Sequence, residues 1–284
     1  MMQNILVTGS KGQLGNAIKK ISSKLINSNF FFTDIEELDI TSYDQIGKFI
    51  QKNKINIVIN CAAYTAVDQA ETDREKAFLI NVTAVEYLSI QAKANNATLI
   101  HISTDYVFDG TSHIPYKETD IPDPKSYYGL TKYEAEQKIE QFAENAIIIR
   151  TSWLYSEYGN NFVKTMIRLG NEKESLNVIN DQFGSPTYAA DLADTIINLT
   201  QVRIKGITFY NYSNEGSCTW YEFAKAIMEL KKINCVVNPI TTEEYPTAAV
   251  RPKYSLLDKS KIKKELNIEI PFWKESLKTC LKKI

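Results

Sequence analysis

The first 152 residues alternate between short apolar runs and longer amphipathic segments, and this alternation restricts the fold more than any other feature. The apolar runs predict buried strands at 4–9, 28–34, 54–63, 97–103 and 145–152. Helical patterns lie between them, roughly at 12–25, 42–53, 71–95 and 126–143. Repeated strand–helix units with right-handed crossovers form a parallel sheet with helices on both faces. We therefore expect an α/β fold with a doubly wound, Rossmann-like parallel sheet.

The pattern changes after about residue 155. Segment 175–181 is predicted to be a sixth strand, whereas 207–213 is expected to be a short strand of a separate, smaller unit. The remaining segments predict helices near 160–170, 189–201 and 219–231, a loop at 241–257 and a terminal helix. We expect a sheet domain over 1–155, with strand and helix contributions from later segments, and a smaller C-terminal lobe over 156–284.

Composition excludes several classes of protein. With 44% hydrophobic and 24% charged residues, the 284-residue chain is an ordinary globular protein, and a net charge of -1 favours neither nucleic acid nor a membrane as partner. No apolar run reaches the ~18 residues of a membrane span. The four cysteines are far apart and form no C-x-x-C, which favours reduced thiols and a cytoplasmic location. With two histidines, a histidine-based metal site or triad is not expected, and we interpret His101 as a strand residue.

The segment TGSKGQLG places Gly9, Gly12 and Gly15 between the first expected strand and the first expected helix. Glycines there allow a tight turn close to a pyrophosphate, and the free N–H groups at a helix start bind anions. The spacing is G-x-x-G-x-x-G rather than the usual G-x-G-x-x-G. Asp34 follows Gly15 by nineteen positions, where a carboxylate can bind the adenosine ribose. A purely structural turn is the alternative, but the strand–turn–helix context favours a dinucleotide site.

A second pattern lies in SYYGLTKYEAE, at 126–136, which contains three tyrosines and one lysine. Only Tyr128 has a lysine four positions later, Lys132, and residues i and i+4 of a helix lie on one face. A phenol titrates near pH ~10, and a neighbouring cation favours its ionised form. We therefore expect Lys132 to lower the pKa of Tyr128, so that the phenol can exchange a proton at neutral pH. Because Tyr-x-x-x-Lys is common on surface helices, the interpretation depends on the rest of the chain.

Small and hydroxyl-bearing residues follow the third and fourth expected strands. Ala62 and Ala63 leave room for a flat cofactor, although ordinary helix–strand packing also requires small residues. Thr104 and Asp105 come directly after Ser103, where a hydroxyl can bind a substrate oxygen beside Tyr128. Such sheets bind ligands at the carboxyl ends of their strands. A turn or cap formed by these polar residues remains the alternative.

The glycine turn, the carboxylate, the hydroxyl and the Tyr-x-x-x-Lys helix occur in an order that resembles the extended short-chain dehydrogenase/reductase family. Longer segments are similar to the dTDP-4-dehydrorhamnose reductase branch of that family: NCAAYTAVDQAE, STDYVFDG, YYGLTK, RTSWLY, NNFVKTM, NDQFGSPT and a late RP. The resemblance covers most of the chain. It implies an enzyme that reduces the C4 keto group of dTDP-4-dehydro-L-rhamnose to give dTDP-L-rhamnose, for cell-surface polysaccharide. It also implies that 1–155 is the NAD(P)-binding domain and that 156–284 is mainly the substrate-binding lobe.

The resemblance assigns roles to individual residues. The implied catalytic residues are Tyr128 as proton donor, Lys132 on the nicotinamide ribose and Thr104 on the reacting oxygen. The implied cofactor-binding residues are Gly9, Gly12, Gln13, Leu14, Gly15, Asp34, Asp39, Ile40, Ala62, Ala63, Tyr64, Thr65, Ile102, Tyr128 and Lys132. The implied substrate-binding residues are Thr104, Asp105, Trp153 and Arg251. Trp153 is expected near the sugar and Arg251 near the diphosphate; a core position for Trp153 and a solvated position for Arg251 are the alternatives.

The cofactor and the partners follow from the same features. Asp34 and the acidic run 36–37 should repel a 2′-phosphate, which favours NADH, but enzymes similar to this chain often accept either cofactor. We therefore expect use of both NADH and NADPH. The expected partner is a small dTDP-sugar, bound by a monomer or a homodimer. In some relatives two glutamates bind magnesium between subunits; Ala17 and Ala190 occupy those places here, so no metal is expected.

Two alternatives to a reductase remain open. The first is another sugar-nucleotide enzyme, an epimerase or a 4,6-dehydratase, although a dehydratase usually has an Asp-Glu pair after the threonine and here Tyr106 follows Asp105. The second is a non-catalytic subunit, because the regulatory subunit of a eukaryotic methionine adenosyltransferase resembles the same reductases. That relative departs from the family around the threonine and the NDQ segment, and this chain retains both.

Overall fold

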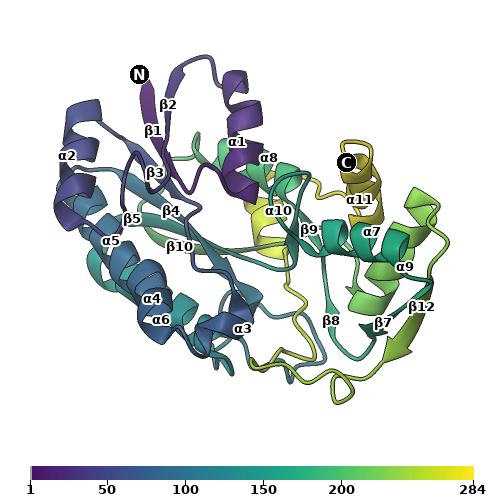
Figure 1. Cartoon of the computed structure of the whole chain (residues 1–284). Coiled ribbons are helices and arrows are strands. Elements are labelled where there is room, and N and C mark those ends of the chain that lie inside the picture. Colours follow the sequence, from purple (N-terminus) through teal and green to yellow (C-terminus); the bar gives the residue numbers. More distant parts are fainter. Residues whose placement is uncertain (1) are drawn as a thin grey trace.

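The computed structural model describes residues 2–284 and shows a six-stranded sheet with a smaller lobe beside it (Figure 1). The sheet contains β1 (Gln3–Thr8), β2 (Ser28–Phe32), β3 (Ile57–Asn60), β4 (Thr98–Thr104), β5 (Asn145–Thr151) and β10 (Gly206–Tyr212). All neighbouring strands are parallel, in the order β10-β5-β4-β3-β1-β2. The order reverses between β1 and β3, which places a ligand site at the carboxyl ends of these strands. The predicted doubly wound fold is confirmed.

Helices cover both faces of the sheet, as Figure 1 shows. One face carries α1 (Gln13–Ile21), α8 (Ala189–Leu199) and α10 (Ser260–Leu266); the other carries α2 (Tyr43–Asn53), α5 (Ala84–Ala94) and α6 (Tyr127–Phe142). Because both faces are covered, the central strands are almost continuously apolar. The helix expected at 71–95 is divided. A short α3 (Val67–Ala70) precedes α4 (Arg74–Phe78), which continues through a π-helical turn, Leu79–Thr83, into α5.

The prediction that 175–181 is the sixth strand of the sheet was wrong. β7 (Ser175–Ile179) pairs in parallel with β12 (Val236–Ile240) outside the main sheet, and β10 takes the sixth place, next to β5. Residues of β7 alternate between exposed and buried, as in a strand with one face in solvent. The end of β10 is buried. Length and hydrophobicity alone did not separate the two strands.

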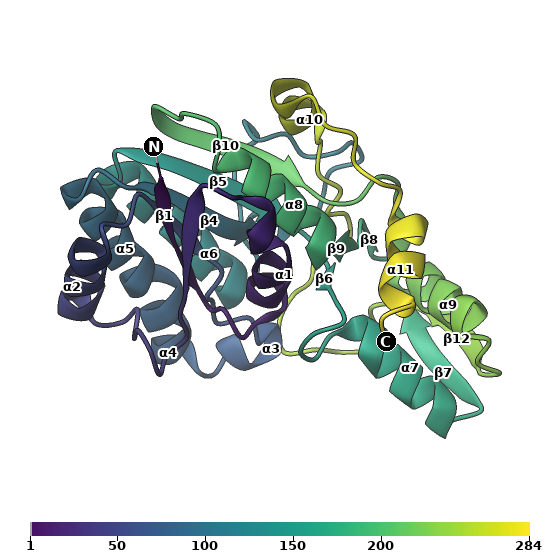
Figure 2. The same ribbon diagram turned by 90° about the horizontal axis from the view of Figure 1, so that it is seen from above.

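The lobe packs around its own apolar core and lies beside the sheet in both views (Figure 2). It contains α7 (Phe162–Glu172), α9 (Trp220–Lys231), α11 (Trp273–Leu281) and the β7–β12 pair, with Tyr155, Phe223 and Trp273 in the core. Two short pairs complete it: β6 (Leu154–Tyr155) with β9 (Thr187–Tyr188), and β8 (Phe183–Gly184) with β11 (Cys218–Thr219). The second half of the chain therefore forms this lobe and also supplies α8, β10 and α10 to the sheet domain.

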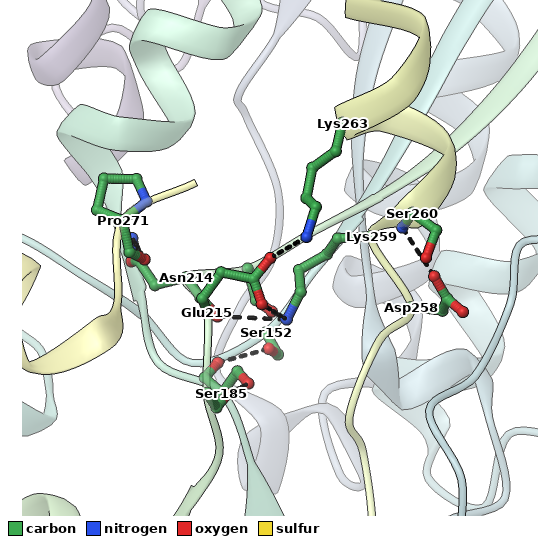
Figure 3. Close-up of polar contacts among 11 residues, drawn as sticks. Ser152, Ser185, Asn214, Glu215, Asp258, Lys259, Ser260, Lys263 and Pro271 are labelled. Carbon is green, nitrogen blue, oxygen red and sulfur yellow. Dashed lines mark hydrogen bonds and ion pairs between the residues drawn. The ribbon is translucent and has the colours of Figure 1, made fainter. Parts of the chain in front are cut away.

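A polar cluster after β10 joins the last part of the chain to both units (Figure 3). Glu215 accepts a hydrogen bond from Lys263 Nζ at 2.8 Å and forms an ion pair with Lys259 at 3.6 Å. Its backbone N–H donates to Pro271 O at 2.9 Å, in the segment that leads into α11. Nearby, Ser152 Oγ donates to Ser185 O at 2.7 Å. Glu215 therefore connects α10 and α11 to the end of a sheet strand.

Residues 2–284 contain no helix that is both long and apolar enough to cross a membrane. They also contain no group of three or more His, Cys, Asp or Glu side chains arranged to hold a metal ion. The four cysteines are free thiols, as predicted.

Candidate active site

A cleft of about 590 Å³ lies at the carboxyl ends of β1, β3, β4 and β5, between the sheet and the lobe. Of the residues expected to bind cofactor or substrate, its lining contains Gly12, Gln13, Leu14, Ala62, Ala63, Thr65, Ile102, Thr104, Asp105, Tyr128, Lys132 and Trp153. The expected residues outside the lining are Gly9, Gly15, Asp34, Asp39, Ile40, Tyr64 and Arg251. The fold thus brings most of the predicted site together, although the residues come from distant parts of the chain.

The glycine turn has the shape that a dinucleotide site requires. Gly9 has φ +63°, and a Cβ there would lie 2.6 Å from the backbone N of Ala62. A Cβ on Gly15 would collide with the carbonyl oxygen of Gly9. Gly9 and Gly15 are therefore needed for the turn and for close packing of α1. Gly12 precedes α1 and lines the cleft, so the N–H groups at the start of this helix are available to an anionic ligand.

Asp34 lies against this turn. Its Oδ2 accepts a hydrogen bond from the backbone N–H of Lys11 at 3.1 Å, and the Lys11 side chain forms an exposed ion pair with Glu36. A carboxylate and a cation therefore lie side by side next to the glycine turn.

Three other predicted cofactor residues make local contacts. Asp39 Oδ1 accepts from the hydroxyl of Thr41 at 2.7 Å, Ile40 is buried, and Tyr64 N–H donates to Asn81 Oδ1 at 2.8 Å. The structure therefore gives these three residues roles in turns and packing.

Helix α6 presents Tyr128 to the cleft and turns Tyr127 away from it. Ser126 caps the helix by accepting from Gly129 N–H at 3.1 Å, and a Cβ on Gly129 would collide with Tyr106 O. Gly129 thus lets α6 approach the turn that follows β4. Tyr127 packs against Arg74, whose guanidinium carbon lies 4.8 Å from the ring centre. The two neighbouring tyrosines therefore have different environments.

The predicted electrostatic effect of Lys132 on Tyr128 is wrong for this structure. Lys132 Nζ donates to Ile102 O at 2.7 Å and lies 3.1 Å from His101 Nε2, so it is directed at the sheet. Burial raises the pKa of Tyr128 to about 12, and a hydrogen bond with Thr104 opposes this shift. Burial also lowers the pKa of Lys132 to about 8. Desolvation, which favours the neutral form of both groups, is the largest cause of both shifts.

Thr104 and Asp105 form the polar end of β4. Thr104 Oγ1 donates to Asp105 Oδ1 at 3.0 Å and accepts from Tyr106 N–H at 3.3 Å, which caps the 3₁₀ turn Asp105–Val107. Asp105 is 1% exposed, and burial raises the pKa of its carboxyl to about 6. The Ser255 hydroxyl lies close enough to oppose this rise, although Oδ2 has no partner of good hydrogen-bond geometry among residues 2–284. A buried acceptor in the lining of a cleft can bind a ligand hydroxyl.

Trp153 lies at the boundary between the sheet and the lobe. It has φ +48°, which is uncommon for a large side chain and typical of functional positions. Its ring stacks on Trp220, with centroids 3.6 Å apart. A Cβ on Gly184 would lie 2.6 Å from the Trp153 ring, so this glycine of the NDQFGSPT segment makes room for it. Trp153 is therefore partly a packing residue and partly a wall of the cleft.

The sequence interpretation missed two aromatic residues of the lobe, Phe162 and Trp220, which also line the cleft. Their rings are 4.6 Å apart. Phe162 lies within the NNFVKTM segment, which could have indicated it. Trp220 follows Thr219, a helix cap, and carries no signal that separates it from a core residue.

Arg251 lies outside the cleft, in the lining of two adjoining cavities of about 800 and 890 Å³. The larger of these shares Phe162 and Trp220 with the cleft. Arg251 forms a bidentate ion pair with Asp68, with N–O distances of 3.0 and 2.6 Å. The hydrogen bond from Arg251 lowers the pKa of Asp68. The ion pair with Asp68 therefore fixes the Arg251 side chain at the edge of the site, so it is not a freely solvated loop residue.

Comparison with known proteins agrees with this geometry. Residues 2–284 match the family described as RmlD substrate binding domain. The chain is 42% identical to a dTDP-4-dehydrorhamnose reductase of Aggregatibacter actinomycetemcomitans, with 98% of each protein covered. The chain belongs to this family of reductases, a branch of the extended short-chain dehydrogenase/reductases. The resemblance inferred from the sequence is thereby confirmed.

Two further relatives are informative. The spore coat polysaccharide biosynthesis protein SpsK of Bacillus subtilis is 40% identical, over 99% of this chain and 97% of that protein. The crystal structure of dTDP-4-dehydrorhamnose reductase from Bacillus anthracis, in complex with NADP, is 40% identical and has a TM-score of 0.94, with 100% of both chains covered. The fold of the whole chain, lobe included, is therefore that of the family.

Proposed function

We propose that the protein is an NAD(P)H-dependent oxidoreductase that reduces the C4 keto group of dTDP-4-dehydro-L-rhamnose to give dTDP-L-rhamnose. Membership of the reductase family, at 42% identity over nearly the whole chain, supports this reaction. The structural observation that carries the proposal is the cleft of about 590 Å³, which contains the glycine-turn helix start, Thr104, Tyr128 and Lys132 together. A dinucleotide site and a proton donor in one cleft fit a reaction that transfers a hydride and a proton.

The residues at the carboxyl ends of β1 and β3 fit a nicotinamide dinucleotide, which when bound would supply the hydride. The proposed contacts are the helix start at Gly12, Gln13 and Leu14, with Gly9 and Gly15 shaping the turn. Ala62, Ala63, Thr65 and Ile102 would form the floor and sides. Asp34 would bind the adenosine ribose, and Lys11 beside it could balance a 2′-phosphate. The two side chains together support use of both NADH and NADPH.

Tyr128 is the proposed proton donor. As the alcohol forms, negative charge develops on the carbonyl oxygen, and a hydroxyl within hydrogen-bond reach stabilises it and donates a proton. A phenol with a pKa of about 12 holds its proton at neutral pH, so it is available for transfer. Thr104, which interacts with Tyr128, would bind the same oxygen. Lys132 would bind the nicotinamide ribose from the next turn of α6.

The substrate is proposed to lie between the two units, with 156–284 contributing mainly to its binding. The buried carboxyl of Asp105, which lies beside Ser255, would accept a hydrogen bond from a sugar hydroxyl. Trp153, with Trp220 and Phe162, would form an aromatic wall. Arg251 would bind the diphosphate, since an arginine engages phosphate oxygens as it engages the two oxygens of Asp68 here. We further propose that the protein works in the cytoplasm, as a monomer or homodimer.

Product identification tests the function. Purified protein is supplied with NADH or NADPH and the dTDP-linked 4-keto sugar, with the UDP- and GDP-linked analogues as controls. Stoichiometric cofactor oxidation confined to the dTDP sugar, with dTDP-L-rhamnose as product, is the expected result. Turnover of a UDP or GDP sugar alone would refute the substrate. Conversion without net cofactor oxidation would indicate an epimerase or dehydratase, and no turnover with a stably bound protein partner would indicate a regulatory subunit.

A further inference from the structure

An ion pair between Asp68 and Arg251 joins the sheet domain to a distant loop. Asp68 lies on the short helix α3, which follows the cleft residues Ala62 and Ala63, and Arg251 lies in the loop after β12. The two side chains are 44% and 21% exposed. A partly exposed pair contributes little to stability, so its place at the edge of a cavity indicates another role. The reaction described above does not use Asp68.

The backbone around Arg251 is held independently of this pair. Lys253 O accepts a hydrogen bond from the backbone N–H of Phe183 at 2.8 Å. A Cβ on Gly110 would lie 2.5 Å from Pro252, so this glycine lets the two segments approach each other. These contacts place the start of the arginine side chain. They do not orient its guanidinium, which lies at the end of a long, flexible side chain.

Asp68 and one backbone carbonyl orient the guanidinium. Arg251 Nη1 donates to Asp68 Oδ1 at 3.0 Å and to Ala249 O at 3.4 Å, and Nη2 donates to Asp68 Oδ2 at 2.6 Å. Asp68 Oδ1 also accepts from the backbone N–H of Ala249 at 3.1 Å. The hydrogen bond from Arg251 lowers the pKa of Asp68, so the carboxylate keeps its charge at neutral pH.

These contacts leave one edge of the guanidinium without a partner. A guanidinium has five N–H groups, and the contacts above use three of them. The other two are Nε–H and the second N–H of Nη2, which point the same way along one edge. Nε has no acceptor among residues 2–284, and it is not a buried atom. Two parallel N–H groups match two oxygens of a phosphate.

The free edge belongs to a residue that lines both cavities beside the cleft. The cavity of about 890 Å³ shares Phe162 and Trp220 with the cleft and also contains Asp68. Among the residues that line this cavity, the cations are Arg251 and Lys173. A ligand that extends from the cleft into the cavity can therefore contact the guanidinium without breaking its pair with Asp68.

We propose that Asp68 is a positioning residue for the diphosphate, because it holds Arg251 with the Nε–Nη2 edge free for phosphate oxygens. This inference rests on the proposed function, in which Arg251 binds the diphosphate. The opposite role is competition, in which the carboxylate occupies the arginine and the phosphate must displace it. The free edge favours positioning, since one anion can bind each edge. An arginine that is already ordered loses less conformational entropy when the ligand binds.

Calorimetric titration with dTDP distinguishes the two roles. Asp68→Ala should raise the Kd of dTDP about tenfold, because the arginine must then be ordered by the ligand. Asp73→Ala is the control: Asp73 is an exposed carboxylate five positions later that accepts from the Tyr64 hydroxyl at 3.2 Å. It should change the Kd less than about twofold. Tighter binding to Asp68→Ala would show competition and overturn the proposal, and so would an unchanged Kd.

A ligand without phosphate separates positioning from a purely structural role. Thymidine, titrated by ligand-observed NMR, should bind Asp68→Ala and the wild type with the same Kd. Equal losses for thymidine and dTDP would mean that Asp68 supports the cavity as a whole, which would overturn the proposal. In Arg251→Ala, the further change Asp68→Ala should cause no additional loss of dTDP affinity, because Asp68 acts through the arginine. A full additional loss would contradict that route.

Kinetics complete the test. Asp68→Ala should raise KM for the dTDP sugar by the same factor and leave kcat and the cofactor KM within about twofold. If the wild type binds UDP or GDP instead of dTDP, a tenfold loss of that nucleotide in Asp68→Ala would support the role of Asp68 and refute the proposed substrate. Normal binding of dTDP by both proteins would refute only the role of Asp68. If Asp68→Ala does not fold, Asp68→Asn keeps the shape of the side chain and should show a smaller loss in the same direction.

Discussion

Three ionisable residues of the site are each displaced toward their neutral forms. Burial raises the pKa of Tyr128 to about 12 and that of Asp105 to about 6, and it lowers the pKa of Lys132 to about 8. The common cause is desolvation at the carboxyl end of β4, where the cleft has few free counter-charges. Such shifts in a cleft are typical of functional residues. They also make stability depend on pH, because the pKa of each group differs between the folded and the unfolded protein.

Asp105→Asn should stabilise the protein above pH 6. A raised pKa means that the folded state holds the proton more tightly, so the stability that Asp105 contributes is complete below pH ~4 and is lost as the pH rises to about 6. Asparagine cannot ionise, and we expect the variant to be more stable than the wild type at pH 7.5 by about 1–3 kcal/mol. Thermal unfolding at pH 5.0 and 7.5 measures this, and the advantage should shrink at the lower pH.

Asp109→Asn is the matched control. The hydrogen bonds from Thr111 lower the pKa of Asp109, so its contribution is present at neutral pH and is lost as the pH falls. This variant should therefore be less stable than the wild type at pH 7.5. If both substitutions changed the stability at pH 7.5 in the same direction, the explanation given for Asp105 would be wrong.

Asp34 should control the choice of cofactor. Its carboxylate lies against the backbone of Lys11, where it would bind a ribose hydroxyl and repel a 2′-phosphate. We expect Asp34→Ala to raise the ratio of kcat/KM for NADPH to that for NADH by about tenfold. Lys11→Ala should lower the same ratio, because it removes the cation beside the phosphate position. An unchanged ratio in Asp34→Ala would mean that Asp34 does not face the ribose.

Helix α6 organises the site at the scale of one element. Tyr128, Lys132 and Glu136 follow one another at intervals of four residues, so one face of the helix carries two residues of the cleft and, one turn further on, the buried Glu136. Glu136 and Arg150 are 1% and 3% exposed, and the guanidinium lies 5.0 Å from the ring centres of both Phe108 and Phe209. The ion pair thus anchors α6 on β5 beneath the site.

Glu136→Gln should strongly destabilise the protein, because it leaves Arg150 buried without a counter-charge. We expect a loss of about 3–5 kcal/mol. Glu172→Gln is the control, since Glu172 pairs with Arg168 on the exposed face of α7 and should cost less than about 1 kcal/mol. Denaturant unfolding measures both. Equal losses in the free energy of unfolding for the two variants would show that burial does not increase the contribution of the Glu136–Arg150 pair to stability.

Strands and helices of the first half were predictable because apolar periodicity reports burial directly. The five sheet strands before residue 155 coincide with the predicted runs, except that β1 begins one residue earlier and β4 ends one residue later, whereas β7 and β10 were exchanged. Both strands are short apolar runs. Which strand each one pairs with depends on the path of the chain between strands, and the local hydrophobic pattern does not report that path. The same limit applies to α4 and α5, where the π-helical turn at Leu79–Thr83 has no sequence signature that was recognised.

The site could be predicted where a role depends on local spacing. Gly9, Tyr128 and Lys132 are examples, since a turn and an i, i+4 pair are local features. The role of Trp220 could not be predicted, because its position in the cleft depends on how the lobe packs against the sheet. The hydrogen bond between His101 and Lys132 joins residues thirty-one positions apart and needs the packing of α6 on β4. The roles assigned to cofactor and substrate residues stay predictions.

At the scale of the whole molecule, the cleft exists because the chain crosses between its two units several times. The segment after β5 enters the lobe, α8 and β10 return to the sheet, and α10 precedes the final helix of the lobe. Glu215 lies at the junction, with Lys259, Lys263 and the segment before α11 (Figure 3). Lys259 is 9% exposed; burial lowers the pKa of its ammonium group, and Glu215 opposes this shift.

Glu215→Gln should weaken the attachment of the C-terminal segment. We expect a loss of about 1–3 kcal/mol, because a mostly buried ammonium loses its partner. Hydrogen exchange should increase over residues 258–284 more than elsewhere. Asp194→Asn, which breaks an exposed pair with Lys24, is the control and should have little effect. Uniform exchange across the chain in Glu215→Gln would rule out a local role.

The most direct test of the whole account compares the two adjacent tyrosines of α6 in the reduction of the dTDP-linked 4-keto sugar. Tyr128→Phe removes the proposed proton donor and keeps most of the packing, so kcat should fall on the order of 10²-fold or more while cofactor affinity is retained. Tyr127→Phe makes the same chemical change at a ring that packs against Arg74, and it should leave kcat within about threefold of the wild type. A large loss in Tyr127→Phe together with a small loss in Tyr128→Phe would contradict the assignment of Tyr128 and with it the proposed mechanism.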